Sequence, residues 1–96
     1  MKGGDIMTIY DKIVKCDKIT CFIEGSNTNS ILIIYKKDML KTQFYEAVIS
    51  LIDKFANTFL ITTVTLCGYE TENSKELKTI FTGSYTKLQK LIRGVL

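Results

Sequence analysis

The sequence predicts an α+β domain in which a short N-terminal helix precedes two strand–strand–helix units. Apolar runs of strand length occur in two pairs, and each pair is followed by a segment with helical spacing of its apolar residues. The composition is that of a globular domain, with 46% hydrophobic and 24% charged residues. We therefore expect one four-stranded antiparallel sheet packed by helices.

Residues 1–6 are expected to be a non-native leader to this domain. With one choice of codons, residues 2–5 back-translate into a string that contains a bacterial ribosome-binding site, at a suitable distance before Met7. The pattern predicts a single domain over 7–96 and a bacterial or phage source. An ordinary N-terminal tail is the alternative reading.

A capping motif predicts the N-terminal helix. Thr8, followed by Asp11 three residues later, resembles a capping box, and a short apolar stripe runs on to Val14. The helix is expected to end near Lys15 or Cys16. Because a helix this short is marginal in isolation, it must pack on the rest of the domain.

A hairpin is predicted next. Residues 18–24 alternate between the two faces of a strand, and residues 31–35 are apolar on both faces, which is typical of a buried central strand. Residues 25–30 are a dense cluster of turn-forming residues between them.

The second half repeats this order of elements. Asp38 is expected to cap a long helix that ends at Asn57, with the clearest helical periodicity in the chain. The remaining elements, in order, are a strand over 59–67, a polar loop over 68–76, a shorter strand over 77–82 and a helix capped by Ser84. Extension of the first of these strands into the polar loop is the alternative. Sliding the sequence by 46 residues without a gap places Cys21 on Cys67, which suggests an internal repeat of two ββα units.

The composition leaves little catalytic chemistry. The chain has no histidine and no phosphate-binding glycine motif, so the commonest general base and metal ligand is missing. We expect a protein that is not an enzyme and binds neither a metal nor another cofactor. Three cysteines, an odd count without a secretion signal, favour a reducing cytoplasm, here that of a bacterial host cell. No apolar run is long enough to cross a membrane, so no membrane partner is expected.

Positive charge is concentrated at the C-terminal end of a chain whose net charge is +3. Lys87, Lys90 and Arg93 recur three residues apart on one face of the last predicted helix. They are candidate contacts to nucleic-acid phosphates, and a solvated helix face is the alternative.

Two polar clusters are candidate partner-binding sites. The hairpin turn carries four side chains that can form hydrogen bonds, and the later polar loop carries three carboxylates. These residues are Ser26, Asn27, Thr28 and Asn29 in the turn, and Glu70, Glu72 and Glu76 in the loop. Ordinary turn chemistry and solubilisation of a loop are the alternatives.

The segment from Met7 to Asp38 carries a resemblance. Residues 7–13, the turn at 25–31 and the apolar run at 32–34 resemble, with a small gap before the first strand, the start of a family of small phage anti-CRISPR proteins. The family inhibits the single-protein nuclease of type II CRISPR systems. The resemblance implies that the turn reaches toward a nuclease domain, and that carboxylates mimic DNA. The family is strongly acidic whereas this chain is basic, and Asn27 stands where the family pattern has Asp.

The function predicted from these observations is that of a non-enzymatic phage or mobile-element inhibitor of a bacterial defence protein. Its expected partner is a CRISPR effector protein or the ribonucleoprotein complex of that effector. A small nucleic-acid-binding regulator that uses the basic helix is the alternative. Pairing of an exposed sheet edge into a homodimer is compatible with either function.

Overall fold

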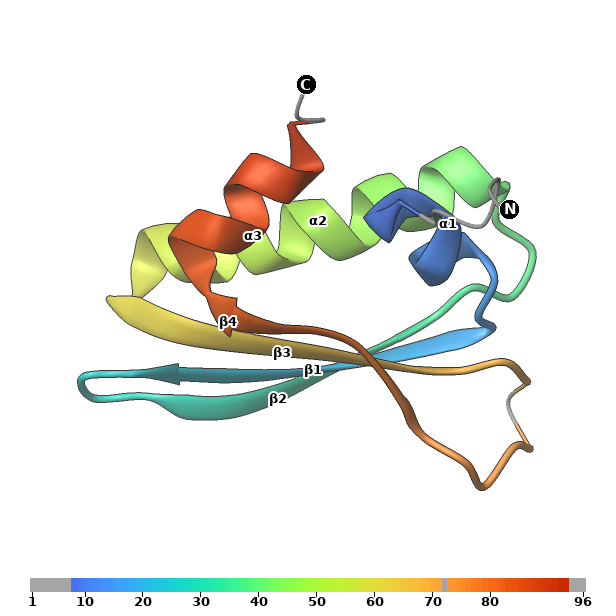
Figure 1. Ribbon diagram of the computed structural model, residues 1–96, viewed down its shortest axis with the longest axis horizontal. Coiled ribbons are helices and arrows are strands. Elements are labelled where there is room, and N and C mark those ends of the chain that lie inside the picture. The colour runs from blue at the N-terminus through green and yellow to red at the C-terminus, as the bar shows by residue number, and fades with distance from the viewer. Residues whose placement is uncertain (1–7, 72, 94–96) are drawn as a thin grey trace, which may run out of the picture.

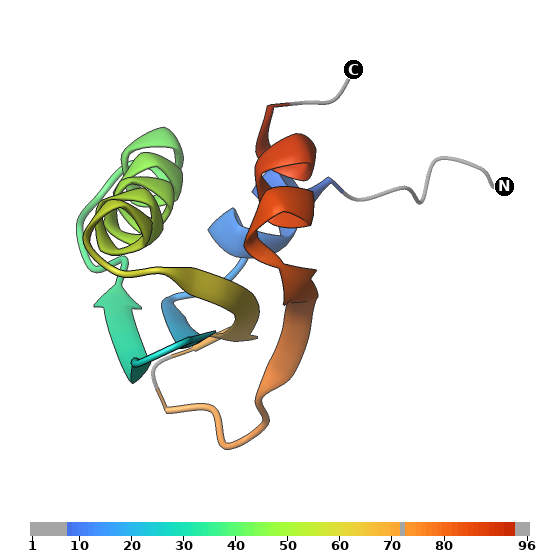
Figure 2. The ribbon, with the colours of Figure 1, turned by 90° about the vertical axis from the view of Figure 1, so that its left-hand side faces the viewer.

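Four strands form one antiparallel sheet in the order β2-β1-β3-β4, and the predicted α+β class is confirmed. The computed structural model describes residues 8–71 and 73–93 (Figure 1). The elements in chain order are α1 (Ile9–Val14), β1 (Lys18–Gly25), β2 (Asn29–Tyr35), α2 (Lys41–Thr58), β3 (Ile61–Tyr69), β4 (Lys78–Ser84) and α3 (Tyr85–Ile92). The helices cover one face of the sheet and leave the other face open (Figures 1 and 2).

The caps predicted for the first and last helices are present. The Thr8 hydroxyl accepts from the backbone N–H of Asp11 at 3.1 Å, and the Asp11 carboxylate accepts from the N–H of Thr8 at 3.2 Å. At α3, the Ser84 hydroxyl accepts from the N–H of Lys87 at 3.1 Å. Each cap satisfies backbone donors that a helix start leaves without partners.

The prediction that Asp38 caps the long helix is wrong. The chain first makes a tight turn in which Lys37 has a φ of 47° and the N–H of Met39 donates to the carbonyl of Lys36. Only then does α2 begin, with Leu40 at the cap position and its N–H donating to the Gln43 side chain at 3.1 Å. Asp38 therefore lies in this turn and not at the start of the helix. At its other end, α2 ends at Thr58, one residue beyond the predicted end at Asn57.

The core lies between the helices and the covered face of the sheet. Its members are fully buried apolar side chains, each stabilising the fold by roughly 1.5–3 kcal/mol relative to exposure. They come from all the helices and from the central strands: Ile13, Ile19, Cys21, Ile23, Phe44, Val48, Ile52, Val64, Leu66 and Leu88. Two side-chain contacts link the helices above this core. Tyr10 of α1 lies edge-on to Tyr45 of α2 at 4.9 Å, and the Tyr85 hydroxyl of α3 donates to Asp53 of α2 at 2.6 Å.

The strand expected to be central is an edge strand. β1 and β3 occupy the middle of the sheet, and β2 pairs only with β1 among the described strands. Leu32 and Ile34 face the helices, whereas Ile31 and Ile33 face the open side and are 58% and 53% exposed. A strand that is apolar on both faces is thus left half uncovered.

The repeat suggested by sliding the sequence through 46 residues fails at the level of register. Cys21 pairs with Leu66 on the covered face of the sheet, whereas Cys67 pairs with Thr20 on the open face. The ungapped match therefore superposes residues that point in opposite directions, because a one-residue change of register reverses every side chain. Residues of the two hairpins that face the same side of the sheet are related by an odd shift in sequence, whereas the shift of 46 residues is even.

Every strand boundary lies within two residues of the predicted one. β2 begins at Asn29, β3 runs from Ile61 to Tyr69, and β4 runs from Lys78 to Ser84 with a register shift near Cys67. The predicted leader at residues 1–6 lies outside the described residues, and so does residue 95, which the sequence pattern placed on the apolar face of the last helix. Within residues 8–71 and 73–93, no helix is long and apolar enough to span a bilayer.

Candidate functional site

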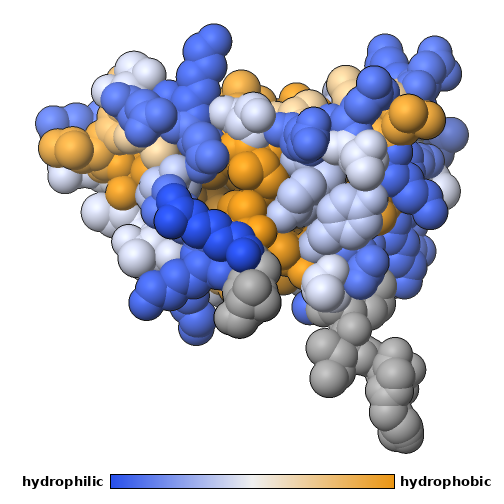
Figure 3. All heavy atoms as spheres, turned by 90° about the horizontal axis from the view of Figure 1, so that it is seen from above, coloured by the Kyte–Doolittle hydropathy of each residue, from blue (hydrophilic) through white to orange (hydrophobic). Residues whose placement is uncertain are grey.

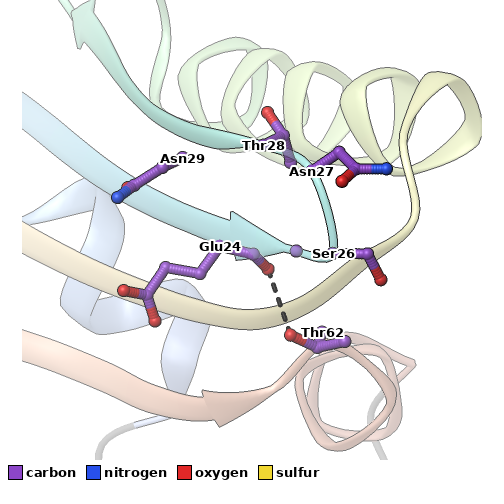
Figure 4. Close-up of a pocket in the computed structure, with 7 residues that line it drawn as sticks. Glu24, Ser26, Asn27, Thr28, Asn29 and Thr62 are labelled. Atoms are coloured by element: carbon purple, nitrogen blue, oxygen red, sulfur yellow. Dashed lines mark hydrogen bonds between the residues drawn. The ribbon is translucent and has the colours of Figure 1, made fainter.

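The hairpin turn lies at one end of the sheet and is shorter than the sequence predicts. The N–H of Gly25 donates to the carbonyl of Thr28 at 2.9 Å, and Glu24 pairs with Asn29 as the last strand pair. In Figure 4, the side chains of Asn27 and Asn29 point in opposite directions from this turn. The turn therefore offers amide groups to two sides of the molecule.

Backbone contacts hold the turn against the loop between α2 and β3. The N–H of Ser26 donates to the carbonyl of Leu60 at 3.3 Å, and the Thr62 hydroxyl donates to the carbonyl of Glu24 at 3.3 Å (Figure 4). A Cβ added at Gly25 would overlap the Leu60 carbonyl oxygen and lie 2.9 Å from the Cα of Ile61. The chain needs glycine at position 25 because the two backbones approach this closely.

Two exposed apolar side chains, which the sequence pattern does not indicate, lie beside the turn. The strand predicted from residue 59 begins at Ile61, so Phe59 and Leu60 lie in the loop, 43% and 81% exposed. Phe59 stacks at a tilt on Phe55 of α2, with ring centroids 4.7 Å apart. The sequence does not indicate that Phe59 and Leu60 are exposed, because two adjacent apolar residues before a β-branched run resemble the start of a strand.

Together these residues form what we call the turn-end surface: Ser26, Asn27, Thr28, Asn29, Phe59, Leu60 and Thr62. Two shallow hollows indent it. One, of about 500 Å³, is lined by the turn, Glu24 and Thr62, and the other, of about 210 Å³, by the turn and residues 58–60. Hydrogen-bonding groups and exposed apolar groups therefore lie side by side on a fixed backbone.

The predicted acidic cluster lies at the opposite end of the sheet. Glu70 directly follows β3, so the length of that strand separates it from the turn, and Glu76 lies in the same distal loop. Glu72 lies outside the described residues. The structure thus does not unite the turn and the carboxylates in one site.

The charge of Glu70 is balanced by two lysines. Its carboxylate lies 3.4 Å from the Lys78 ammonium and 3.5 Å from that of Lys15. The hydrogen bond from Lys78 and the charges of both lysines hold the pKa of Glu70 below its usual value. Among the described residues, this one carboxylate faces two cations, so the negative charge of Glu70 is offset locally.

The three cations predicted at the C-terminal helix are exposed. Lys87 and Lys90 lie on α3 and Arg93 follows its last residue. None of them forms an ion pair with any other side chain in the described ranges. Figure 3, which looks onto the helices, shows a polar outer surface around an apolar strip.

The thiols are buried and suited to packing. Burial raises the pKa of Cys21 to about 12 and also raises that of Cys16, so both thiols stay protonated at neutral pH. In the part of the chain that the structure describes, no three histidine, cysteine, aspartate or glutamate residues are grouped to hold a metal ion.

Comparisons of this chain with protein-family models, with curated proteins and with solved structures found no match.

Proposed function

We propose that this protein is a non-enzymatic inhibitor that binds a bacterial defence protein through the turn-end surface. The observation that carries the proposal is the joint between the hairpin turn and the loop at Leu60. It presents a largely exposed leucine beside four polar turn residues, and hydrogen bonds between backbones fix their relative positions. A surface ordered before binding loses less conformational entropy when a partner is bound.

The chemistry of this surface favours a protein partner. Protein interfaces commonly combine a desolvated apolar centre with a rim of hydrogen-bonding groups. Leu60 and Phe59 supply the apolar centre, and the amides and hydroxyls of the turn supply the rim. Small-molecule sites are instead concave and bury most of their ligand, whereas the residues around these hollows are mostly exposed.

The proposed partner is a CRISPR effector nuclease, in keeping with the resemblance of Met7 to Asp38 to anti-CRISPR proteins. The turn is the element that the resemblance directs toward a nuclease domain, and the turn-end surface is built around it. DNA mimicry by the acidic loop is less favoured, because Glu70 is balanced by Lys15 and Lys78. We therefore assign the primary contact to the turn and not to the carboxylates.

The test measures binding to a type II effector nuclease loaded with guide RNA, and inhibition of its DNA cleavage. The double variant Asn27→Ala/Asn29→Ala and the single variant Leu60→Ser are compared with Leu91→Ser, which removes an exposed leucine from α3. Loss of a central anchor is expected to cost about 2 kcal/mol, or roughly 30-fold in Kd. Leu91→Ser should bind like the wild type.

Two results would overturn the proposal. The first is a wild-type chain that binds no effector of this class and leaves DNA cleavage unchanged. The second is inhibition of DNA cleavage that persists in both turn-end variants. The assignment of the contact to the turn-end surface would then be wrong, even if the protein were an inhibitor.

Nucleic-acid binding is the second candidate, and the exposed cations of α3 favour it. Contacts from Lys87, Lys90 and Arg93 to phosphates would make the affinity fall steeply with salt concentration. Lys87→Gln/Lys90→Gln should then reduce the slope of log K against log salt by about two. An unchanged slope, measured by fluorescence anisotropy with labelled single-stranded and duplex DNA, would exclude this role for α3.

A further inference from the structure

We propose that the free edge of β2 pairs with β2 of a second copy of this chain, which joins two four-stranded sheets into one continuous sheet. The inference does not depend on the proposed function. It rests on the backbone groups that β2 leaves open, on its side chains and on the charges at its two ends.

The hydrogen-bond pattern identifies which backbone groups of β2 are free. The bonds Gly25 N–H to Thr28 carbonyl and Lys36 N–H to Asp17 carbonyl, each 2.9 Å, extend the β1–β2 register at both ends. Bonded and non-bonded pairs alternate along an antiparallel ladder, so the even-numbered residues of β2 bond to β1. The N–H and carbonyl groups of the odd-numbered residues point outward: Asn29, Ile31, Ile33 and Tyr35.

This edge lacks the devices that normally prevent pairing. Residues 29–35 contain no charged residue and no proline, whereas protected edges carry charges, prolines or bulges. The opposite edge strand, β4, begins with Lys78 and has a register shift against β3. Within residues 8–71 and 73–93, no strand pairs with the outer edge of β2.

The side chains of β2 are complementary to a second β2 about a two-fold axis at Leu32. In this register Ile31 lies opposite Ile33 of the second copy, and Asn29 lies opposite Tyr35. All four outward-facing residues then form bonded pairs, as an antiparallel ladder requires. Four isoleucines, two from each chain and each more than half exposed in the single chain, meet on the open face. Cross-strand pairs of β-branched residues stabilise such a junction.

The charges at the two ends of β2 also fit this arrangement. Glu24 lies beside Asn29 at the turn end, and Lys37 follows the other end of the strand with its ammonium 5.9 Å from the Tyr35 ring. A two-fold axis places the end that carries Glu24 next to the end that carries Lys37 in the second copy. One strand pair makes a small interface, so we expect dissociation in the micromolar range.

Sedimentation equilibrium from low micromolar to millimolar concentration tests the proposal on the full chain. We expect a monomer–dimer equilibrium. Ile33→Pro should raise the dissociation constant about tenfold or more, because it removes an outward N–H while sparing every bond to β1. Ile33→Lys should act in the same way by placing charge at the seam. Thr82→Lys, which adds the same charge to an exposed position on β4, is the matched control and should leave the equilibrium unchanged. Circular dichroism and thermal melting confirm that each variant is folded.

Disulfide cross-linking tests the register directly. Ile31→Cys and Ile33→Cys chains, mixed under mild oxidation, should cross-link to each other more efficiently than either does to itself, since bonded antiparallel pairs place Cα atoms about 5.5 Å apart. The native cysteines are buried and do not compete.

Three results would overturn the proposal. One is a chain that stays monomeric over the whole concentration range. Another is a dimer that Ile33→Lys disrupts but Ile33→Pro does not, which indicates stacking of the open faces. The third is a monomer whose binding to an effector is lost in Ile33→Pro, which assigns the edge to a strand of the effector.

Discussion

A glycine packs closely at each end of the sheet, but the two glycines meet different kinds of group. At the turn end, backbone meets backbone, because Gly25 lies against the backbone of Leu60 and Ile61. None of the ion pairs formed within residues 8–71 and 73–93 lies there. At the distal end, backbone hydrogen bonds from Asp17 to Tyr69 and from Lys36 to Asp17 are also present, but the close contacts there involve side chains. Glu70 lies between Lys15 and Lys78, and Gly68 lies against the Cys16 side chain. Backbone contacts fix a surface, whereas side-chain contacts adjust to a neighbour. This difference is why we place recognition at the turn end.

Among the variants that test this difference, Gly25→Ala is expected to change the free energy of unfolding most. The new Cβ would overlap the Leu60 carbonyl, and neither backbone can move without separating the turn from β3. We expect a loss of about 3 kcal/mol in the free energy of unfolding, measured by urea denaturation. Ser26→Ala, at the exposed neighbouring position, should change it by less than about 0.5 kcal/mol. A Gly25→Ala variant as stable as the wild type would show that the joint is not rigid.

Gly68→Ala should cost less, about 1–2 kcal/mol. A Cβ here would overlap the Cys16 sulfur and lie 3.1 Å from Ile80 Cδ1, and both contacts are with side chains that can shift. The double variant Gly68→Ala/Cys16→Ala should recover part of the loss, because it removes the sulfur. If Gly68→Ala proved more destabilising than Gly25→Ala, the contrast between the two ends would be wrong.

Tyr85→Phe tests the hydrogen bond that links α3 to α2 near the turn end. Removing the donor to Asp53 is expected to cost about 1 kcal/mol at neutral pH, with Tyr10→Phe as a control that keeps its ring contact. Burial and the Asp53 carboxylate raise the pKa of Tyr85 to about 12. Because the folded state holds this proton more tightly, the stabilisation is complete below the unfolded pKa of about 10 and decreases as the pH rises toward 12. Urea denaturation should show that the wild type exceeds Tyr85→Phe in free energy of unfolding by less at pH 11 than at pH 7. An equal difference at both pH values would contradict a stabilising hydrogen bond from Tyr85 to Asp53.

The smallest effect is expected at Glu70, whose carboxylate is exposed. Its lowered pKa means that the lysines stabilise the folded chain above the unfolded pKa of the carboxyl, and that this contribution is lost as the pH falls through the folded pKa. Nuclear magnetic resonance titration of the carboxyl carbon measures the shift. Lys15→Gln/Lys78→Gln should return the pKa toward its usual value, and an unaltered midpoint would mean that the ion pairs do not form in solution.

Sequence patterns over a few neighbouring residues predicted the helices and strands well. Contacts between residues far apart in the sequence could not be predicted from them. Thr8 and Ser84 were recognisable as caps because a cap depends on residues only three positions away. The position of β2 at the edge was not predictable, because a run that is apolar on both faces favours a central strand and only the order of strands in space decides otherwise. Asp38 is not the cap because it lies in the tight turn at Lys37, and the cap position falls at Leu40. The backbone of Lys36, just before that turn, is bonded to Asp17, which precedes β1.

The candidate site was predictable in part for the same reason. The polar turn was visible as a cluster of neighbouring residues. The exposure of Leu60, and the neutralisation of Glu70 by Lys15, each required knowledge of where β3 begins and ends. A sequence pattern reports which residues can bind, but whether they are paired within the chain depends on distant segments.

The order of strands has a consequence for the speed of folding. Each hairpin pairs neighbouring segments, but the central pairing joins Lys18 to Tyr69, across α2 and most of the chain. Closing so long a loop is entropically costly, so we expect the seam between β1 and β3 to form late and to limit the folding rate. During synthesis the first hairpin leaves the ribosome with both edges open. Until β3 emerges, that hairpin is the segment most exposed to pairing with another chain.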